Sequence, residues 1–211
     1  MIFGIEGITP HIFISLLIYA SVSSGTPGPN NMMLLASGMN FGFRRTIPHM
    51  LGISIGFSVV LLALGLGLGE VFRLYPITYI TLKYAGAAYM VYLSWQIANA
   101  KPPQTEGTKG AKHKSLKPMS FIGAAAFQWV NPKAMIMAAT YFSAYVPLGD
   151  SWQKLAFVIG LYTPVNLICI SLWAILGVKL ADYLGVNRNR KIFNYTMAGL
   201  LLLSLAPILW E

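Results

Sequence analysis

Two proline motifs interrupt long apolar segments of this 211-residue chain. The first is Thr26-Pro27-Gly28-Pro29-Asn30-Asn31, and the second is Val130-Asn131-Pro132-Lys133-Ala134. No Asp, Glu, Lys or Arg occurs from Gly7 to Phe43, and only Lys133 occurs from Pro118 to Gly149. Because proline removes a backbone donor and clashes with the preceding turn, each motif is expected to open a helix. Inside hydrocarbon, such an opening must be buried in protein or line a wet cavity.

The composition indicates an integral membrane protein. Hydrophobic residues make up 56% of the chain and charged residues 10%, whereas soluble domains carry about 25% charged residues. The single cysteine and the lack of a nucleotide loop, a Cys/His cluster or a Ser/His/Asp set argue against an enzyme, a metal site and a cofactor. No Lys or Arg precedes Arg44, so a cleaved signal peptide is not expected and the first apolar segment is retained.

Six apolar segments are predicted to cross the membrane as helices, since a hydrocarbon core of about 30 Å needs roughly 20 helical residues. They cover residues 10–42, 48–69, 76–99, 118–146, 152–178 and 190–210 approximately. The first and fourth are too long for one straight crossing, because thirty helical residues span about 45 Å. The predicted fold class is therefore all-α and membrane-integral, with the first and fourth helices broken at the proline motifs.

A basic polar loop at 101–117 divides the chain into the halves 1–100 and 118–211, each with three predicted spans. Its Lys, Gly and Pro content is typical of a flexible cytoplasmic linker, and a lipid-headgroup patch is the alternative. Three spans per half force the second half to run inverted relative to the first. Two inverted three-helix repeats are a known transporter architecture. Weak sequence echoes support the repeat: Pro29-Asn30 with Pro132-Lys133, and Ala85-Gly86 with Ala198-Gly199.

The positions of the basic residues predict the orientation. If the loops 43–48, 100–118 and 179–191 face the cytoplasm, they collect most of the 15 Lys and Arg residues there, and both termini lie outside. This distribution in short loops accounts for the net charge of +9 without nucleic acid. His49 falls at the cytoplasmic edge of the second span and is expected to be an interfacial residue.

The first break places two amide side chains at a helix start. Asn30 and Asn31 follow Pro29, which suits the first position of a helix. That helix start presents free N–H groups and the positive end of its dipole, and both attract an anion. At mid-membrane the expected anion is a substrate carboxylate. The alternative is that Thr26 or one of the Asn residues caps a kinked structural helix.

Lys133 is the strongest candidate for function, because a charge inside a membrane is costly and rare. It lies beside Asn131 and close to Gln128. Two roles suit it: a partner for a carboxylate, or an amine that changes protonation during transport. The alternative is a lysine that snorkels to the cytoplasmic interface. Asn166 follows Pro164 in the fifth span, where a third kink would turn its amide inward.

These residues predict a substrate site between the two breaks. A carboxylate would meet Pro29 to Asn31 and Lys133, while an ammonium group would meet freed carbonyl groups near Ser24–Gly25 and Gln128–Trp129. A secondary transporter surrounded by lipid is the expected function. The alternatives are a passive channel, and a membrane assembly protein whose helices are kinked for structural reasons.

Several motifs together resemble the LysE/RhtB family of amino-acid exporters. They run in family order along nearly the whole chain: Thr26 to Asn31, Gly42-Phe43-Arg44-Arg45, the pair Gly52 and Gly56, Gly86-Ala87-Ala88-Tyr89, and Val130 to Ala134. The resemblance implies six spans in a bacterial inner membrane and outward transport of amino acids coupled to the proton gradient. The family's Pro-Gly-Pro element falls on Pro27, Gly28 and Pro29, and its Asn-Pro-Lys element on Asn131, Pro132 and Lys133.

The detailed form of these motifs resembles the branch that exports cysteine and O-acetylserine, and homoserine and threonine are the other candidate solutes. One position departs from the family. Many members carry an acidic residue just after the second Gly of the second span, where this chain has Phe57. If protons are coupled, Lys133 or the substrate's own amine must take part. A homo-oligomer is left open.

Overall fold

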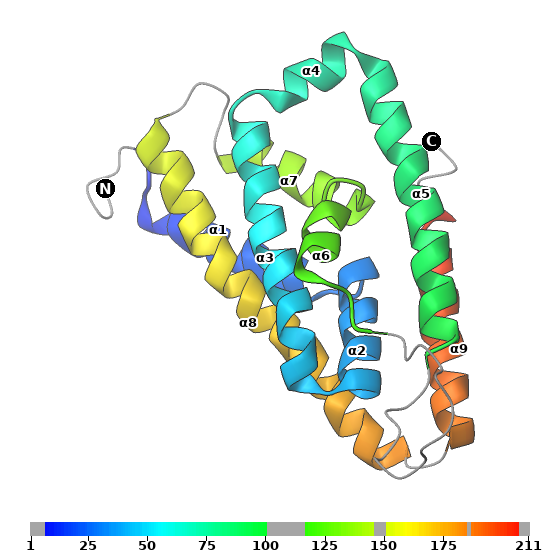
Figure 1. Ribbon diagram of the computed structural model, residues 1–211. Helices are drawn as coiled ribbons and strands as arrows, with labels where there is room; N and C mark the ends of the chain where they lie inside the picture. The colour runs from blue at the N-terminus through cyan, green and yellow to red at the C-terminus, as the bar shows by residue number, and fades with distance from the viewer. Residues whose placement is uncertain (1–6, 101–116, 146–150, 185–186, 207–211) are drawn as a thin grey trace.

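The computed structural model describes residues 7–100, 117–145, 151–184 and 187–206 (Figure 1). Every regular element within these ranges is an α-helix, so the all-α prediction is confirmed for them. The helices are α1 Pro10–Gly25, α2 Pro29–Phe41, α3 Phe43–Gly65, α4 Leu68–Leu74, α5 Pro76–Ala98, α6 Phe121–Phe127, α7 Pro132–Tyr145, α8 Trp152–Leu184 and α9 Asn187–Leu203.

Among the described residues, two helical stretches are long and apolar enough to cross a membrane alone, Phe43–Gly65 and Trp152–Tyr183. The apolar helix α1 has only 16 residues because its segment is divided. The division into six crossings therefore stays a prediction. Boundaries also differ from those expected: α3 begins at Phe43, directly after the turn at Gly42, whose φ of 79° suits glycine.

Both predicted breaks are present. The helix α1 ends at Gly25, and after three non-helical residues α2 begins at Pro29. In the second segment α6 ends at Phe127 and α7 begins at Pro132. Each second half-helix thus begins with proline, whose missing N–H would have had no helical partner at that position. The expected third kink does not divide its helix, because α8 continues through Pro164.

The half-helices pack between the long helices. In the first segment, α1 and α2 both lie against α8, and in the second, α6 lies against α3. The helices α5 and α9 pair with one another at one side of the bundle (Figure 1). Large apolar side chains are exposed on the outer faces of α1, α3 and α8, as lipid-facing surfaces require; they include Ile14, Ile18, Val22, Ile55, Val59, Leu172 and Leu176.

Glycines allow α2 and α8 to meet backbone to backbone. A Cβ atom at Gly38 would overlap the carbonyl oxygen of Ala174, and one at Gly177 would overlap that of Leu35. The same device brings α3 onto α6, where Gly56 faces the backbone of Ala125. Small residues at such positions let membrane helices approach closely and gain van der Waals contact. The contact between α2 and α8 therefore depends on two positions that tolerate no side chain.

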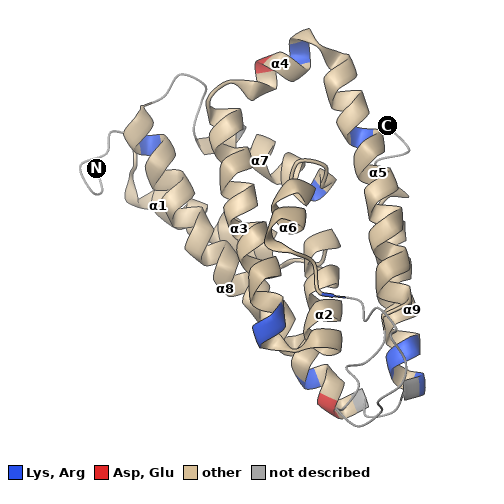
Figure 2. Cartoon of the chain, viewed as in Figure 1, with Lys and Arg blue, Asp and Glu red and all other residues tan. Residues whose placement is uncertain are grey.

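Charged residues gather at the two ends of the bundle. Basic residues concentrate where α3 and α9 begin and α8 ends, whereas the end that carries α4 has fewer (Figure 2). We refer to the first of these as the basic end. His49 does not lie at a surface there, since its side chain is 1% exposed. The expectation of an interfacial histidine was wrong, because α2 and the segment before α6 cover this turn of α3.

Replacing Gly177 with alanine is expected to force α2 away from α8 and to lower the stability of the folded protein by about 1–3 kcal/mol. Rigid backbone atoms of Leu35 and Met39 occupy the space that the methyl group needs. Thermal unfolding of purified protein in detergent measures this change. Gly160→Ala in the same helix is the matched control, since nothing lies within 4 Å of a Cβ there. Equal melting temperatures for the two variants would contradict the assignment.

Candidate functional site

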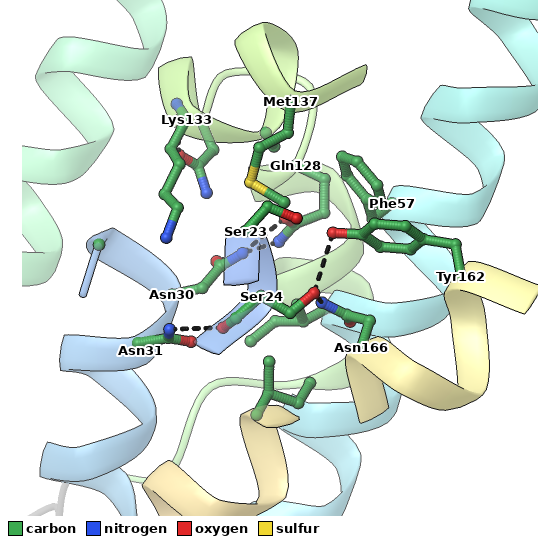
Figure 3. A pocket seen from close by; sticks show the side chains of 15 residues that line it. Ser23, Ser24, Asn30, Asn31, Phe57, Gln128, Lys133, Met137, Tyr162 and Asn166 are labelled. Atoms are coloured by element: carbon green, nitrogen blue, oxygen red, sulfur yellow. Dashed lines mark hydrogen bonds between the residues drawn. The ribbon is translucent and has the colours of Figure 1, made fainter. Parts of the chain in front are cut away.

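A small cavity lies where the two breaks meet (Figure 3). Side chains from both broken segments and from α3 and α8 line it: Ser23, Ser24, Gly28, Asn30, Asn31, Ile53, Phe57, Gln128, Asn131, Lys133, Ala134, Met137, Tyr162, Asn166 and Ile170. Of the residues expected from sequence, Gly28, Asn30, Asn31, Gln128, Asn131, Lys133 and Asn166 line this central cavity. Pro27, Pro29 and Pro132 are not among the lining residues and instead form the breaks.

Asn31 closes the first break. Its buried side-chain amide donates hydrogen bonds to the carbonyl oxygens of Ser24, at 2.8 Å, and Thr26, at 2.7 Å. These oxygens belong to the end of α1 and the residue after it, where intrahelical partners run out. Asn31 therefore caps the end of α1, and because it also lines the central cavity its binding of substrate stays a prediction. Its Nδ2 atom is committed to holding the break.

Asn30 joins the first broken segment to the second. Its Nδ2 atom donates to Oε1 of Gln128 at 2.8 Å, and Nε2 of Gln128 donates back to Oδ1 of Asn30 at 3.2 Å. Gln128 is fully buried and also donates to the carbonyl oxygen of Ala124 at 2.8 Å. This reciprocal amide pair fixes the two segments against each other at the cavity (Figure 3).

Lys133 reaches from the second break to the first. Its Nζ donates to the Thr26 carbonyl oxygen at 2.7 Å, the Thr26 hydroxyl at 3.0 Å and the Pro27 carbonyl oxygen at 3.3 Å. It does not snorkel to the interface, as its alternative role required. Gly28 makes this reach feasible, because a Cβ there would press on the Lys133 side chain.

The charge on Lys133 is balanced by carbonyl dipoles. Within the described ranges no carboxylate forms an ion pair with it, and no Asp or Glu lines the central cavity. The oxygens that it binds lie just past the last turn of α1, where the helix dipole is negative and favours a cation. The N-terminal ends of α2 and α7 at the cavity add positive potential. Lys133 is the one charged residue among the described residues that line the central cavity, so this cavity suits an anionic group.

A buried chain of hydrogen bonds forms another wall. The Ser24 hydroxyl pairs with that of Tyr162 at 3.0 Å and accepts from Nδ2 of Asn166, also at 3.0 Å. Ser54 donates to Oδ1 of Asn166 at 2.8 Å. Asn166 therefore points into the site as expected, although Pro164 does not divide α8. Sequence reasoning missed Ser24 as a side-chain ligand and Tyr162 entirely; the four-residue spacing from Tyr162 to Asn166 on one helix was the available signal.

Aromatic rings cover one side of the cavity. The rings of Phe57 and Tyr162 lie 4.8 Å apart, and those of Tyr162 and Tyr141 lie 5.5 Å apart. Tyr19 extends the cluster to α1 and donates to the Met137 carbonyl oxygen at 3.1 Å. Phe57 is thus buried between α3 and α8 as an aromatic wall, and its position supplies no titratable group.

The free space in the central cavity is small, with room for about one water molecule. A free amino acid has several times as many heavy atoms. The chain therefore adopts a closed conformation at this site, and a solute of that size needs the two segments to move apart.

Comparison with known proteins identifies the family. The model of the LysE type translocators matches residues 21–210. The chain belongs to this family. Its relatives include the cysteine/O-acetylserine efflux proteins of Escherichia coli K12, Shigella sonnei and Shigella flexneri, each 35% identical over 155 residues. These matches cover 72% of this chain and 73% of each relative. No solved structure matches the chain.

Membership of the LysE family confirms the resemblance seen in the sequence and the transport function that it implied. The chain is an amino-acid exporter of the bacterial inner membrane, it crosses that membrane more than once, and it is not an enzyme. The solute, the site residues, the orientation and the use of protons stay predictions.

The pairing of Asn30 with Gln128 predicts strong coupling between the two positions. Asn30→Ala and Gln128→Ala should each destabilise the exporter, because each removes the amide pair; Asn30→Ala leaves the buried Oε1 of Gln128 without this donor, and Gln128→Ala leaves the half-buried amide of Asn30 without its partner. The double variant should be less destabilised than the sum of the two, with a coupling of about 1–2 kcal/mol. Thermal unfolding of the four proteins in one detergent gives this cycle. Additive effects would mean that the pair contributes nothing to the closed state.

Proposed function

We propose that this LysE-type exporter moves small neutral amino acids through the central cavity, with cysteine and O-acetylserine as the first candidate solutes. The names of the bacterial relatives support the solute class. One observation carries the choice of site: the Lys133 ammonium, the start of α2 and the Asn30–Gln128 pair converge in a cavity whose described lining residues include no Asp or Glu. Such a site favours a carboxylate, and the part of the cavity lining that is apolar can contact a small side chain.

In the proposed binding mode, the substrate carboxylate replaces the Thr26 and Pro27 oxygens as the partner of Lys133. The freed carbonyl oxygens then accept hydrogen bonds from the substrate ammonium, since each carbonyl has two lone pairs. Ile53, Met137 and Ile170 supply the apolar wall for the side chain. A large side chain would collide with the aromatic cluster around Phe57 and Tyr162, so the site favours small solutes.

Two inverted repeats, 1–100 and 118–211, are part of the proposal. The packing of helices supports them: α3 lies on α6, the first half of the second broken segment, and α8 lies on α1, the first half of the first. If each helix of one half is replaced by its equivalent in the other half, the first of these contacts becomes the second. The contacts of α3 with α8 and of α5 with α9 each join equivalent helices, so both fit the same two-fold symmetry. Rocking of one repeat against the other would expose the site alternately to each side.

The basic end is proposed to face the cytoplasm, which follows the positive-inside rule. Figure 2 supports this with the concentration of basic residues where α3 and α9 begin. The helix α1 begins, and α9 ends, away from that end, in keeping with termini outside (Figure 1). The predicted cytoplasmic loop at 101–117 lies outside the described residues except for Lys117. Both terminal stretches, 1–6 and 207–211, also lie outside them.

Lys133→Ala and Asn30→Ala are expected to reduce transport of labelled cysteine by purified protein in liposomes. Loss of a hydrogen bond to a charged group is worth about 1.5–3 kcal/mol, so the loss for Lys133→Ala should be about 10- to 100-fold. Lys179→Ala is the control, because Lys179 is exposed near the end of α8 and lines neither break. If both site variants transport at the wild-type rate, the central cavity is not the substrate site.

Saturation distinguishes a carrier from the passive channel that was the alternative. An exporter that closes around one solute should show a KM and should accelerate labelled uptake when unlabelled cysteine is preloaded. A channel would show flux that rises linearly with concentration and no counter-transport.

Proton coupling is proposed to involve Lys133 or the substrate amine, since Phe57 offers no acidic group. With one proton exchanged per solute, a gradient of one pH unit should support accumulation of up to about tenfold, because one such unit is worth 1.36 kcal/mol. Liposomes with an imposed pH gradient measure this ratio. Accumulation that is insensitive to the gradient would exclude proton exchange.

A further inference from the structure

A second cavity lies closer to the basic end of the bundle and shares no lining residue with the central cavity. It is enclosed by α2, α3, α5 and the segment that precedes α6, and we call it the inner cavity. Met33, Asn40, His49, Gln96 and Lys117 represent these four elements in its lining. Its free space holds a few water molecules, which is more than the central cavity holds.

His49 is the unusual residue of the inner cavity. Its side chain is buried in α3, and neither ring nitrogen has a hydrogen-bond partner among the residues that the structure describes. Buried polar atoms are almost always paired, so an unpaired imidazole that lines a cavity indicates a ligand or water there. The neighbouring polar side chains form hydrogen bonds with other residues: Ser37 pairs with Thr46 at 2.9 Å, and Asn40 donates to Asn194 at 2.8 Å.

The lining defines the chemistry of this ligand. Lys117 brings a positive charge to an exposed position at the cavity, and the His49 ring supplies an N–H donor. No Asp or Glu is among the described residues that line the inner cavity, and Met33, Leu93 and Met119 form an apolar surface. A carboxylate suits the nitrogen groups of His49 and Lys117, and a small uncharged side chain suits the apolar surface. A small zwitterionic amino acid has a carboxylate and such a side chain, whereas an inorganic anion would contact only the nitrogen groups.

The inner cavity lies on the way from the basic end to the central cavity. Along α2, Asn30, Met33 and Ser37 share one helical face, because they are three and four residues apart. Asn30 lines the central cavity, and the other two line the inner one. Met33 packs in the same buried cluster as Phe127, the residue before Gln128. The barrier between the cavities thus consists of Met33 with Phe127, followed by Asn30 with Gln128.

We propose that the inner cavity is an entry site, in which His49 and Lys117 bind the carboxylate of the solute before it passes this barrier. The proposal rests on the proposed role of the central cavity as the transport site. In this proposal His49 contacts the substrate only when the solute arrives from the cytoplasmic side. A residue that is needed merely for folding would have no such one-sided effect.

Vesicles of opposite sidedness test the entry site. In inside-out vesicles, labelled cysteine kept reduced meets the cytoplasmic face, and in right-side-out vesicles it meets the outer face. For His49→Gln and for Lys117→Gln we expect a KM about tenfold higher in inside-out vesicles, in line with the loss of a hydrogen bond to a charged group. The maximal rate in inside-out vesicles should stay within about twofold. Because the equilibrium of transport fixes the ratio of Vmax/KM in the two directions, Vmax/KM must fall by the same factor in right-side-out vesicles. There we expect a lower maximal rate at an unchanged KM.

Lys117→Gln keeps the test valid if His49→Gln folds poorly, because Lys117 is exposed and its replacement disturbs no packing. Lys179→Gln is the matched control, since it removes a basic-end charge that lines neither cavity. The entry site is overturned if both variants keep the wild-type KM in inside-out vesicles, if the KM rises equally in both vesicle types, or if Lys179→Gln has the same effect.

Variants of the central cavity separate this result from the proposed function. Lys133→Ala and Asn30→Ala should lower transport in both vesicle types, because every solute passes the central cavity. If they leave transport intact in both, the proposed transport site is wrong whatever His49 does. If they abolish it while His49→Gln and Lys117→Gln change nothing, only the entry site is wrong.

Discussion

The structure depends on how an interrupted backbone is satisfied at a depth where water is scarce. Thr26 and Pro27 lie between α1 and α2, where carbonyl groups lack a partner within a helix. Asn31 binds the Ser24 and Thr26 oxygens from the same segment, and Lys133 binds the Thr26 and Pro27 oxygens from the opposite segment. The first break is therefore stabilised in part by the second. The Asn30–Gln128 pair in turn joins the second segment to the first, so each break is stabilised in part by the other.

This mutual dependence links stability to function. The oxygens that satisfy Lys133 in the closed state are also its competitors for a substrate carboxylate. A solute that takes over Lys133 removes one hydrogen bond from the Thr26 carbonyl, which keeps Asn31, and one from the Pro27 carbonyl. The ammonium group of an amino acid can replace both. A simple carboxylic acid lacks that group. The arrangement thus favours a zwitterion over an anion through the balance of hydrogen bonds.

Features set by single residues were predictable from the sequence, and features set by tertiary contact were not. Proline chemistry located both breaks, and the rarity of charge in a membrane singled out Lys133. Whether Asn31 capped its own segment or faced a solute depended on how the chain turns after Thr26, which no local pattern records. Ser24 and Tyr162 are common residue types that gain meaning only because α1 packs on α8. The position of His49 near the end of a predicted span indicated an interfacial residue, but the segment before α6 covers it, and this contact is not visible in the sequence.

The packing of α2 indicates which side of the site opens. The helix is buried along nearly its whole length, and through Gly38 and Gly177 its backbone lies directly on that of α8. This close backbone contact joins the two proposed repeats, so we expect the rocking of one repeat against the other to pivot about it. The opposite side of α2 is held by the Asn30–Gln128 pair and by the contact of Met33 with the cluster around Phe127. Opening toward the basic end therefore requires the α6–α7 segment to separate from α2, and this movement joins the inner cavity to the central one.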